Sequence, residues 1–317
     1  MGSDAIALPL LNEIAEVFSS DVEIIGVFTQ PDRRQGRGMK QISNPIKRWA
    51  ETRSIPIIQP QKLTEADYLW LEQHGCELLL VMAYGHIIRK RLLELPRLGA
   101  FNFHTSLLPA YRGASPIQTA IACGERKTGV TLMGMSRGMD EGPIVDQEPL
   151  AIDSTDTAQT IWDKAADACC PLLKRNLPSI LTGKVQLTPQ DSTRATYCRR
   201  LQKEDAYLDF QAPARTLYDR IRAFSPWPGA SFQWQGTSLK IGAAQWQETT
   251  NGKPPGTLLG LVDNAFGIAT GDGTLLLTQL QRPGGRMLGA KEFLSGFDLP
   301  SGEILESQPM APLIVEK

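Results

Sequence analysis

The feature that most restricts the fold of this chain is the alternation of short apolar runs with helical stretches in its first half. Several of the runs are almost continuously apolar, which is typical of strands covered on both faces. The predicted strands are 22–29, 55–58, 77–84, 100–104 and 129–135. Helical signals, such as Asn44 followed by Pro45, separate them. This order predicts a doubly wound α/β sheet with parallel strands.

The second half has a different pattern. A long predicted helix at 157–176 is followed by a polar stretch without apolar periodicity, which predicts a linker. An amphipathic helix at 213–224 then precedes short strands that are separated by turn signals such as Asp272-Gly273. Many short strands with close turns predict a small β-barrel. The chain therefore divides into a first domain at 1–183, a linker at 184–204 and a second domain at 205–317.

Charge and apolar content exclude several classes of protein. The 33 Lys and Arg residues and 34 Asp and Glu residues leave a net charge of −1, so a nucleic-acid site would have to be a local patch. The apolar runs are far shorter than the ~20 residues that cross a bilayer, and the N-terminus lacks a signal core. We expect a cytoplasmic protein without a membrane segment. The five cysteines lack metal-ligand spacing, so we expect reduced thiols and no metal.

The N-terminus departs from this pattern. Met1 to Asp4 reads as a loop between a strand and a helix, but no strand precedes it. A βαβ fold normally has its first strand at this place. We expect either that the sequence begins late or that the sheet lacks a strand and leaves a neighbouring edge exposed.

The densest polar segment covers 101–121 and 128–145. Asn102 and His104 are two residues apart, so both point to one face at the C-terminal end of a predicted strand, where open α/β sheets bind ligands. An amide beside an imidazole can stabilise an oxyanion. Asp140, in a glycine-flanked turn, can orient the imidazole or relay a proton. The alternatives are a strand-capping Asn, a satisfied polar His and an ordinary turn Asp.

This segment resembles the active-site signature of the formyltetrahydrofolate-dependent formyltransferases. The family's Asn, His and Asp correspond to Asn102, His104 and Asp140. Its folate-binding loop corresponds to Ser106, Leu107, Leu108 and Pro109. Two apolar side chains in such a turn can flank a flat pterin ring, and the alternative is a loop that packs in the core. The resemblance implies a Rossmann-like catalytic domain joined to an OB-like barrel that binds tRNA, with 10-formyltetrahydrofolate as co-substrate.

Three longer stretches, 26–40, 110–118 and 221–230, resemble the members of the family that formylate an aminoacyl-tRNA. They imply that the acceptor is the α-amine of methionyl initiator tRNA, with no obligatory protein partner. In this interpretation Asn102 and His104 donate to the oxyanion and Asp140 relays the proton, although His104 can instead be the base. The resemblance also implies tRNA contacts by the basic loop, at Arg37, Lys40, Arg33 and Arg34. We expect Arg282, Arg286 and Lys291 of the second domain to extend these contacts.

Other functions remain open. A formyltransferase for a sugar-nucleotide amine and a formyltetrahydrofolate hydrolase share the chemistry, but they should lack the basic loop. Glycinamide ribonucleotide formyltransferase would not need the second domain. A tRNA-binding module without catalysis is the alternative from another class, and the intact Asn102, His104 and Asp140 argue against it.

Overall fold

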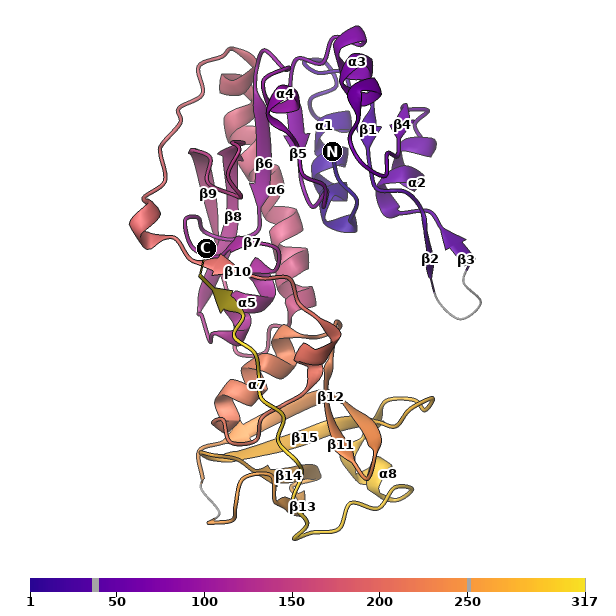
Figure 1. The fold of residues 1–317 in the computed structure, drawn as a ribbon, viewed down its shortest axis with the longest axis vertical. Coiled ribbons are helices and arrows are strands. Elements are labelled where there is room, and N and C mark those ends of the chain that lie inside the picture. The colour runs from indigo at the N-terminus through magenta and orange to yellow at the C-terminus, as the bar shows by residue number, and fades with distance from the viewer. Residues whose placement is uncertain (36–39, 250–251, 317) are drawn as a thin grey trace. The chain divides into compact units, whose positions relative to one another are not determined.

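The computed structural model describes residues 1–35, 40–249 and 252–316, and the chain forms two compact units (Figure 1). The first unit contains Met1–Arg112, Thr128–Leu150 and Trp162–Thr196. The second unit contains Gly113–Lys127, Ala151–Ile161 and Tyr197–Lys317. Each unit is discontinuous in sequence, so two short segments within 1–183 group with the second unit. The division into a catalytic domain, a linker and a tRNA-binding domain stays a prediction.

A four-stranded sheet forms the centre of the first unit. Its strands, in spatial order, are β5 (Leu79–Val81), β6 (Ala100–His104), β8 (Lys127–Gly134) and β9 (Ile144–Ala151). β5 and β6 are parallel, which confirms an α/β fold with parallel strands. β8 runs antiparallel to β6, so the sheet is mixed (Figure 1). The near-continuous apolar run at 129–135 predicts a strand that is buried on both faces. A parallel and an antiparallel strand can both be buried in this way.

The remaining elements of the first unit surround this sheet. β1 (Val27–Phe28) pairs in parallel with β4 (Ile57–Ile58), and β2 (Arg33–Gln35) forms a hairpin with β3 (Lys40–Ile42). The helices are α1 (Leu8–Glu16), α2 (Pro45–Glu51), α3 (Glu65–Gln73), α4 (Lys90–Leu93) and α6 (Ala158–Leu181), the last of which begins in the second unit. α2 begins as predicted, because the Asn44 side chain accepts a hydrogen bond of 3.0 Å from the Lys47 amide.

Residues 1–3 lie between β1 and β5. The Gly2 amide donates to the Phe28 carbonyl at 3.0 Å, and the Met82 amide donates to the Met1 carbonyl at 3.0 Å. Gly2 and Met82 form one isolated parallel bridge. The N-terminal segment therefore connects the β1–β4 pair to the four-stranded sheet through main-chain hydrogen bonds at a single bridge. Beside it, Phe28, Leu79 and Val81 belong to the same buried apolar cluster.

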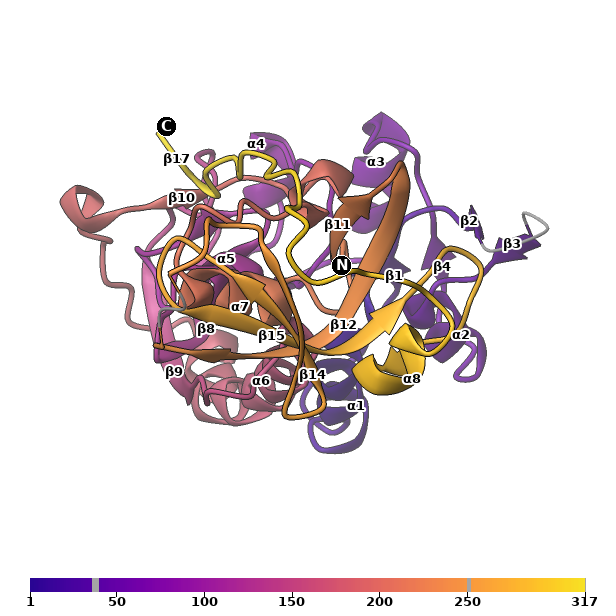
Figure 2. The same cartoon turned by 90° about the horizontal axis from the view of Figure 1, so that it is seen from below.

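The described part of the second unit contains an antiparallel sheet together with short helices. The sheet has the order β11 (Ala230–Trp234), β12 (Thr237–Gln247), β15 (Thr274–Gln281), β14 (Ala265–Ala269) and β13 (Leu258–Val262). β16 (Leu288–Gly289) pairs with β15, and β10 (Tyr197–Cys198) pairs with β17 (Ile314–Val315). Figure 2 shows β12 and β15 side by side. The helices are α5 (Pro116–Ala122), α7 (Ala214–Ala223) and α8 (Ala290–Leu294).

Two general properties concern the chain as a whole. None of the five cysteines, all of which lie in the described ranges, is in a disulfide bond; Cys169 and Cys198 are buried, whereas Cys123 is exposed. Within the described ranges, no helix has the length and apolar character needed to cross a membrane.

Candidate active site

The candidate site begins at the C-terminal end of β6. Asn102 lies opposite Val81 of β5 and Met133 of β8, and His104 lies opposite Thr131 of β8. His104 is 6% exposed, whereas Asn102 is half-buried. Among the described residues, no hydrogen bond engages the Asn102 side-chain amide. The sheet therefore holds a buried imidazole and an accessible amide donor on one face of one strand.

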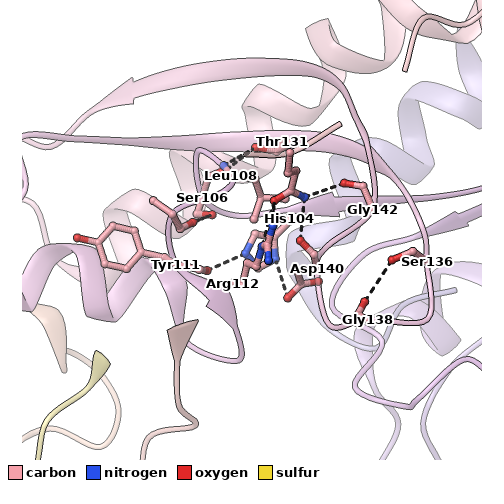
Figure 3. A network of polar contacts seen from close by, with 12 residues as sticks. His104, Ser106, Leu108, Tyr111, Arg112, Thr131, Ser136, Gly138, Asp140 and Gly142 are labelled. Atoms are coloured by element: carbon pink, nitrogen blue, oxygen red, sulfur yellow. Dashed lines mark hydrogen bonds and ion pairs between the residues drawn. The ribbon is translucent and has the colours of Figure 1, made fainter. Parts of the chain in front are cut away.

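His104 lies between two protein oxygen atoms, as Figure 3 shows. Its Nε2 is 2.9 Å from the Tyr111 carbonyl oxygen, and its Nδ1 is 3.7 Å from Oδ2 of Asp140. Because a carbonyl oxygen only accepts, Nε2 carries the hydrogen in this arrangement. In the neutral ring Nδ1 is then the nitrogen without a hydrogen, and it faces the carboxylate. The structure thus brings His104 and Asp140 together, as the sequence predicted for this pair.

Asp140 is held in a tight turn between β8 and β9. Its φ angle is +55°, in the left-handed region that non-glycine residues rarely adopt, and its side chain is 20% exposed. Two residues later the chain passes so close to the Gly134 carbonyl that a Cβ at Gly142 would collide with that oxygen. The turn therefore presents the carboxylate toward His104 in a conformation that its surroundings must stabilise.

The loop at 106–109 is fixed by a buried hydroxyl. Thr131 Oγ1 donates to the Ser106 carbonyl at 2.7 Å and accepts from the Leu108 amide at 3.1 Å (Figure 3). The Gln147 amide donates to the Leu108 carbonyl at 2.9 Å. Leu108 is 3% exposed, which fits the packing alternative for this residue, whereas Leu107 and Pro109 are half-buried. Contact of this loop with folate stays a prediction.

Two unpartnered polar atoms follow β5. In the part of the chain that the structure describes, the Tyr84 hydroxyl and His86 Nε2 are buried without a hydrogen-bond partner. Their rings are 5.0 Å apart. Burial raises the pKa of Tyr84, so its hydroxyl stays protonated and can donate a hydrogen bond. Because β5 and β6 are parallel neighbours, these groups lie at the same edge of the sheet as Asn102 and His104.

The predicted tRNA loop lies at the β2–β3 hairpin. Arg33 is exposed on β2, the backbones of Arg34 and Lys40 are in the hairpin strands, and Arg37 lies outside the described residues. The base of the hairpin is held by Asp32, which accepts from Lys47 Nζ at 2.6 Å and from Gln59 Nε2 at 2.9 Å.

Sequence reasoning missed the side chains that support the site. Arg112, Thr131, Gln147 and Gln190 all hydrogen-bond to its loops or to one another. Nothing in the sequence points to these residues, because a single Arg, Thr or Gln forms no spacing pattern. The burial of Arg112 and Thr131 is known only from the structure. No cluster of three or more His, Cys, Asp or Glu side chains in the described ranges could hold a metal ion.

Comparisons with known proteins agree with this geometry. The family model "Formyl transferase" matches residues 7–176, and "Formyl transferase, C-terminal domain" matches residues 200–298. A methionyl-tRNA formyltransferase from Caldanaerobacter subterraneus is 35% identical over 308 residues, covering 96% of this chain and 98% of the relative. The chain belongs to the methionyl-tRNA formyltransferase family. Another member, from Paraburkholderia phytofirmans, is 38% identical over 92% of each chain. The formyltransferase resemblance of the 101–145 region is confirmed.

Solved structures of formyltransferases have the same fold as this chain. An N-formyltransferase from Helicobacter canadensis, in complex with folinic acid and dTDP-3-aminofucose, matches with a TM-score of 0.65 and 21% identity, over 89% of this chain and 97% of that one. A sugar 3N-formyl transferase, solved with dTDP and 5-N-formyl-THF, matches with a TM-score of 0.66 and 22% identity, over 90% and 97%. At these identities the likeness establishes the fold.

Proposed function

We propose that the side chains at the end of β6 perform formyl transfer in this chain, with Asn102, His104 and Asp140 as the catalytic residues. As a member of its family the chain is an enzyme that transfers the formyl group of 10-formyltetrahydrofolate to methionyl initiator tRNA, for translation initiation. The observation that carries the site assignment is the 3.7 Å contact between His104 Nδ1 and Asp140 beside the free amide of Asn102.

The reaction sets two tasks. The neutral α-amine attacks the formyl carbon, so that a C–N bond forms and the carbonyl oxygen becomes an oxyanion. The bond to N10 of the folate then breaks, the carbonyl re-forms, and N10 takes the proton that the amine loses. The site must therefore stabilise negative charge on oxygen and move one proton from the amine to N10.

Asn102 is suited to the first task. Its side-chain amide has no partner among the described residues, so its N–H groups can donate to the oxyanion as the charge develops. The β6 backbone is paired on both sides, to β5 and to β8, which fixes the position of this donor before the substrate arrives.

His104 and Asp140 are suited to the second task. Both ring nitrogens of His104 face protein groups, and Nε2 is committed to the Tyr111 carbonyl. We therefore assign His104 to proton transfer rather than to oxyanion binding: Nδ1 and the Asp140 carboxylate together accept the proton of the attacking amine and return it to N10.

The formyl donor is assigned to the same edge of the sheet. Ser106, Leu107, Leu108 and Pro109 form one wall, with the half-buried Leu107 and Pro109 as the contacts to the pterin. Tyr84 and His86, whose buried polar atoms have no partner among the described residues, lie after the neighbouring strand and would donate to the ring. No metal takes part in this scheme.

The tRNA is assigned to two regions. Arg33, Arg34 and Lys40 of the β2–β3 hairpin would pair with phosphates of the acceptor stem, together with Arg37, which lies outside the described residues. We interpret the second unit as an OB-like, tRNA-binding barrel, in which Arg282, Arg286 and Lys291 extend the contacts; Arg286 is also paired with Glu292 at 2.9 Å. The family membership supports a tRNA substrate, and these contacts are its proposed physical basis.

The test is a formylation assay with 10-formyltetrahydrofolate and methionyl initiator tRNA. His104→Ala should lower kcat by at least ~10² because it removes the proton-transfer group. His74→Ala is the matched control: it makes the same change at an exposed histidine of α3's C-cap and should retain activity. Turnover of His104→Ala near that of the control would refute the assignment.

A further inference from the structure

Gln190, within the segment that the sequence assigns to a linker, contacts the Asp140 turn. Its Nε2 donates to the Asp140 carbonyl at 2.8 Å and to the Gly142 carbonyl at 2.7 Å. A side-chain amide nitrogen has two hydrogens, so Gln190 can donate one to each of these two carbonyls. One side chain thereby fixes the backbone on either side of Glu141.

Arg112 fixes Gln190 from the other side. Its Nε and Nη2 donate to Oε1 of Gln190 at 3.0 and 2.7 Å, and the Arg112 residue is 3% exposed. Because a guanidinium only donates and a carbonyl only accepts, the Gln190 amide has one satisfied orientation. Arg112 also lies 3.7 Å from Glu141, the residue between the two bonded carbonyls.

The backbone near Gln190 is attached to the same sheet. Thr188 and Ile144, the first residue of β9, exchange two main-chain hydrogen bonds of 2.8 Å each. This bridge lies two residues before Gln190 and two residues after Gly142. The segment at 188–190 is therefore part of the site, because these hydrogen bonds hold it beside the first residue of β9.

We propose that Gln190 is a positioning residue that holds the Asp140 carboxylate against His104, with Arg112 holding Gln190 in turn. The left-handed conformation of Asp140, at φ +55°, has to be stabilised by its surroundings, and the two Gln190 bonds are made to that turn. This inference rests on the proposed function, since it assumes that Asp140 takes part in the reaction.

The first test is Gln190→Glu, which keeps the size of the side chain but replaces the two donors by an oxygen facing two carbonyls. We expect kcat to fall about 10- to 100-fold, because a small misplacement of a catalytic group is costly, while the KM values for tRNA and folate stay within about threefold. Gln233→Glu is the matched control, since Gln233 is half-buried in the second unit and donates to the Tyr207 hydroxyl at 3.0 Å.

The second test is a double-mutant cycle with Asp140→Asn. If Gln190 acts through Asp140, Gln190→Glu should lower kcat by less than about threefold in the Asp140→Asn background. A full multiplicative loss would show a separate structural effect and overturn the proposal.

Gln190→Met is the second variant, for the case that Gln190→Glu does not fold. It removes the two donors without adding a charge, and we expect the same fall in kcat. If Asp140→Asn itself is fully active, the proposed function fails; if Asp140→Asn is impaired while both Gln190 variants match wild type, only the positioning role fails.

Discussion

Asn102 and His104 differ in whether their side-chain polar atoms already face protein oxygen atoms. Both nitrogens of His104 face protein oxygens, at 2.9 and 3.7 Å, whereas the Asn102 amide has no hydrogen-bond partner in the described part of the chain. An imidazole nitrogen that faces a carboxylate can take part in proton transfer, and a free amide donor can bind negative charge that develops on the substrate. This difference is the reason for the proposed division of roles, with oxyanion binding by Asn102 and proton transfer by His104.

Asp32 gives the first prediction at this scale. The hydrogen bond from Lys47, and a second from Gln59, hold the pKa of the Asp32 carboxyl below its ordinary value. Because the folded-state pKa is depressed, the pair stabilises the fold above the unfolded value of ~3.9, and that contribution is lost as the pH falls through the folded value. Asp32→Asn should therefore be less stable than wild type at pH 7.

Urea denaturation of both proteins from pH 7 to pH 3 checks this. The difference in their free energies of unfolding should be largest at neutral pH and should shrink below about pH 4. A difference that is constant, or that grows toward low pH, would show that the Asp32 charge does not stabilise the hairpin base.

Single residues were also where sequence reasoning was most limited. The spacing of Asn102 and His104 on one strand was enough to place them on one face, and the turn around Asp140 was visible from its glycines. The role of Gln190 could not be predicted, because its hydrogen bonds from Arg112 join residues that are 78 positions apart in the chain. Such partners depend on the register between distant segments, which local patterns do not determine.

At the scale of elements, the site is made by loops that follow strands and by side chains that brace them. β6 was predicted with the bounds that the structure has, because a run of apolar residues ending in polar ones marks a buried strand and its end. The bounds of β9 were not predicted, since its residues are half-buried or exposed and do not alternate clearly. The direction of β8 could not be predicted, because burial on both faces does not distinguish parallel from antiparallel pairing.

The loop at 106–109 gives a prediction for Thr131→Val. This change removes the hydroxyl that serves the Ser106 carbonyl and the Leu108 amide, so two buried backbone groups would be without their partner. Each such group costs roughly 1–3 kcal/mol of stability, and the loosened loop should raise the KM for 10-formyltetrahydrofolate several-fold.

Thr131→Ser is the matched control, since it keeps the hydroxyl and removes one methyl group. Thermal unfolding and steady-state kinetics of both variants check the prediction. An unchanged KM in Thr131→Val, together with a lowered Tm, would mean that the loop does not contact the formyl donor.

At the scale of the whole molecule, net charge and tRNA binding have to be reconciled. The chain has a formal net charge of −1, so affinity for a polyanion requires a local group of basic residues, and the β2–β3 hairpin is the proposed one. The change of pattern along the chain predicts two domains, and their bounds stay a prediction. The discontinuous make-up of the two compact units could not be predicted, because segments 113–127 and 151–161 have no composition that distinguishes them.

Salt dependence tests the hairpin contacts. Binding of methionyl initiator tRNA should weaken steeply with salt, because each phosphate contact releases counterions. Replacing Arg33 and Arg34 together by alanine should flatten the plot of log K against log salt by roughly 0.7–0.9 for each phosphate that the variant no longer neutralises. Lys184→Ala removes one positive charge at an exposed lysine of the first unit, outside the hairpin, and should leave the slope unchanged. Equal slopes for wild type and the hairpin variant would remove the hairpin from the tRNA interface.

The most direct test of the account is the choice of acceptor. The fold is shared with sugar N-formyltransferases, whereas the sequence belongs to the methionyl-tRNA formyltransferases. The measurement is formyl transfer from labelled 10-formyltetrahydrofolate to methionyl initiator tRNA and, in parallel, to dTDP-3-aminofucose. We predict label on the tRNA and none on the sugar. Label on the sugar alone, or on neither acceptor, would contradict it.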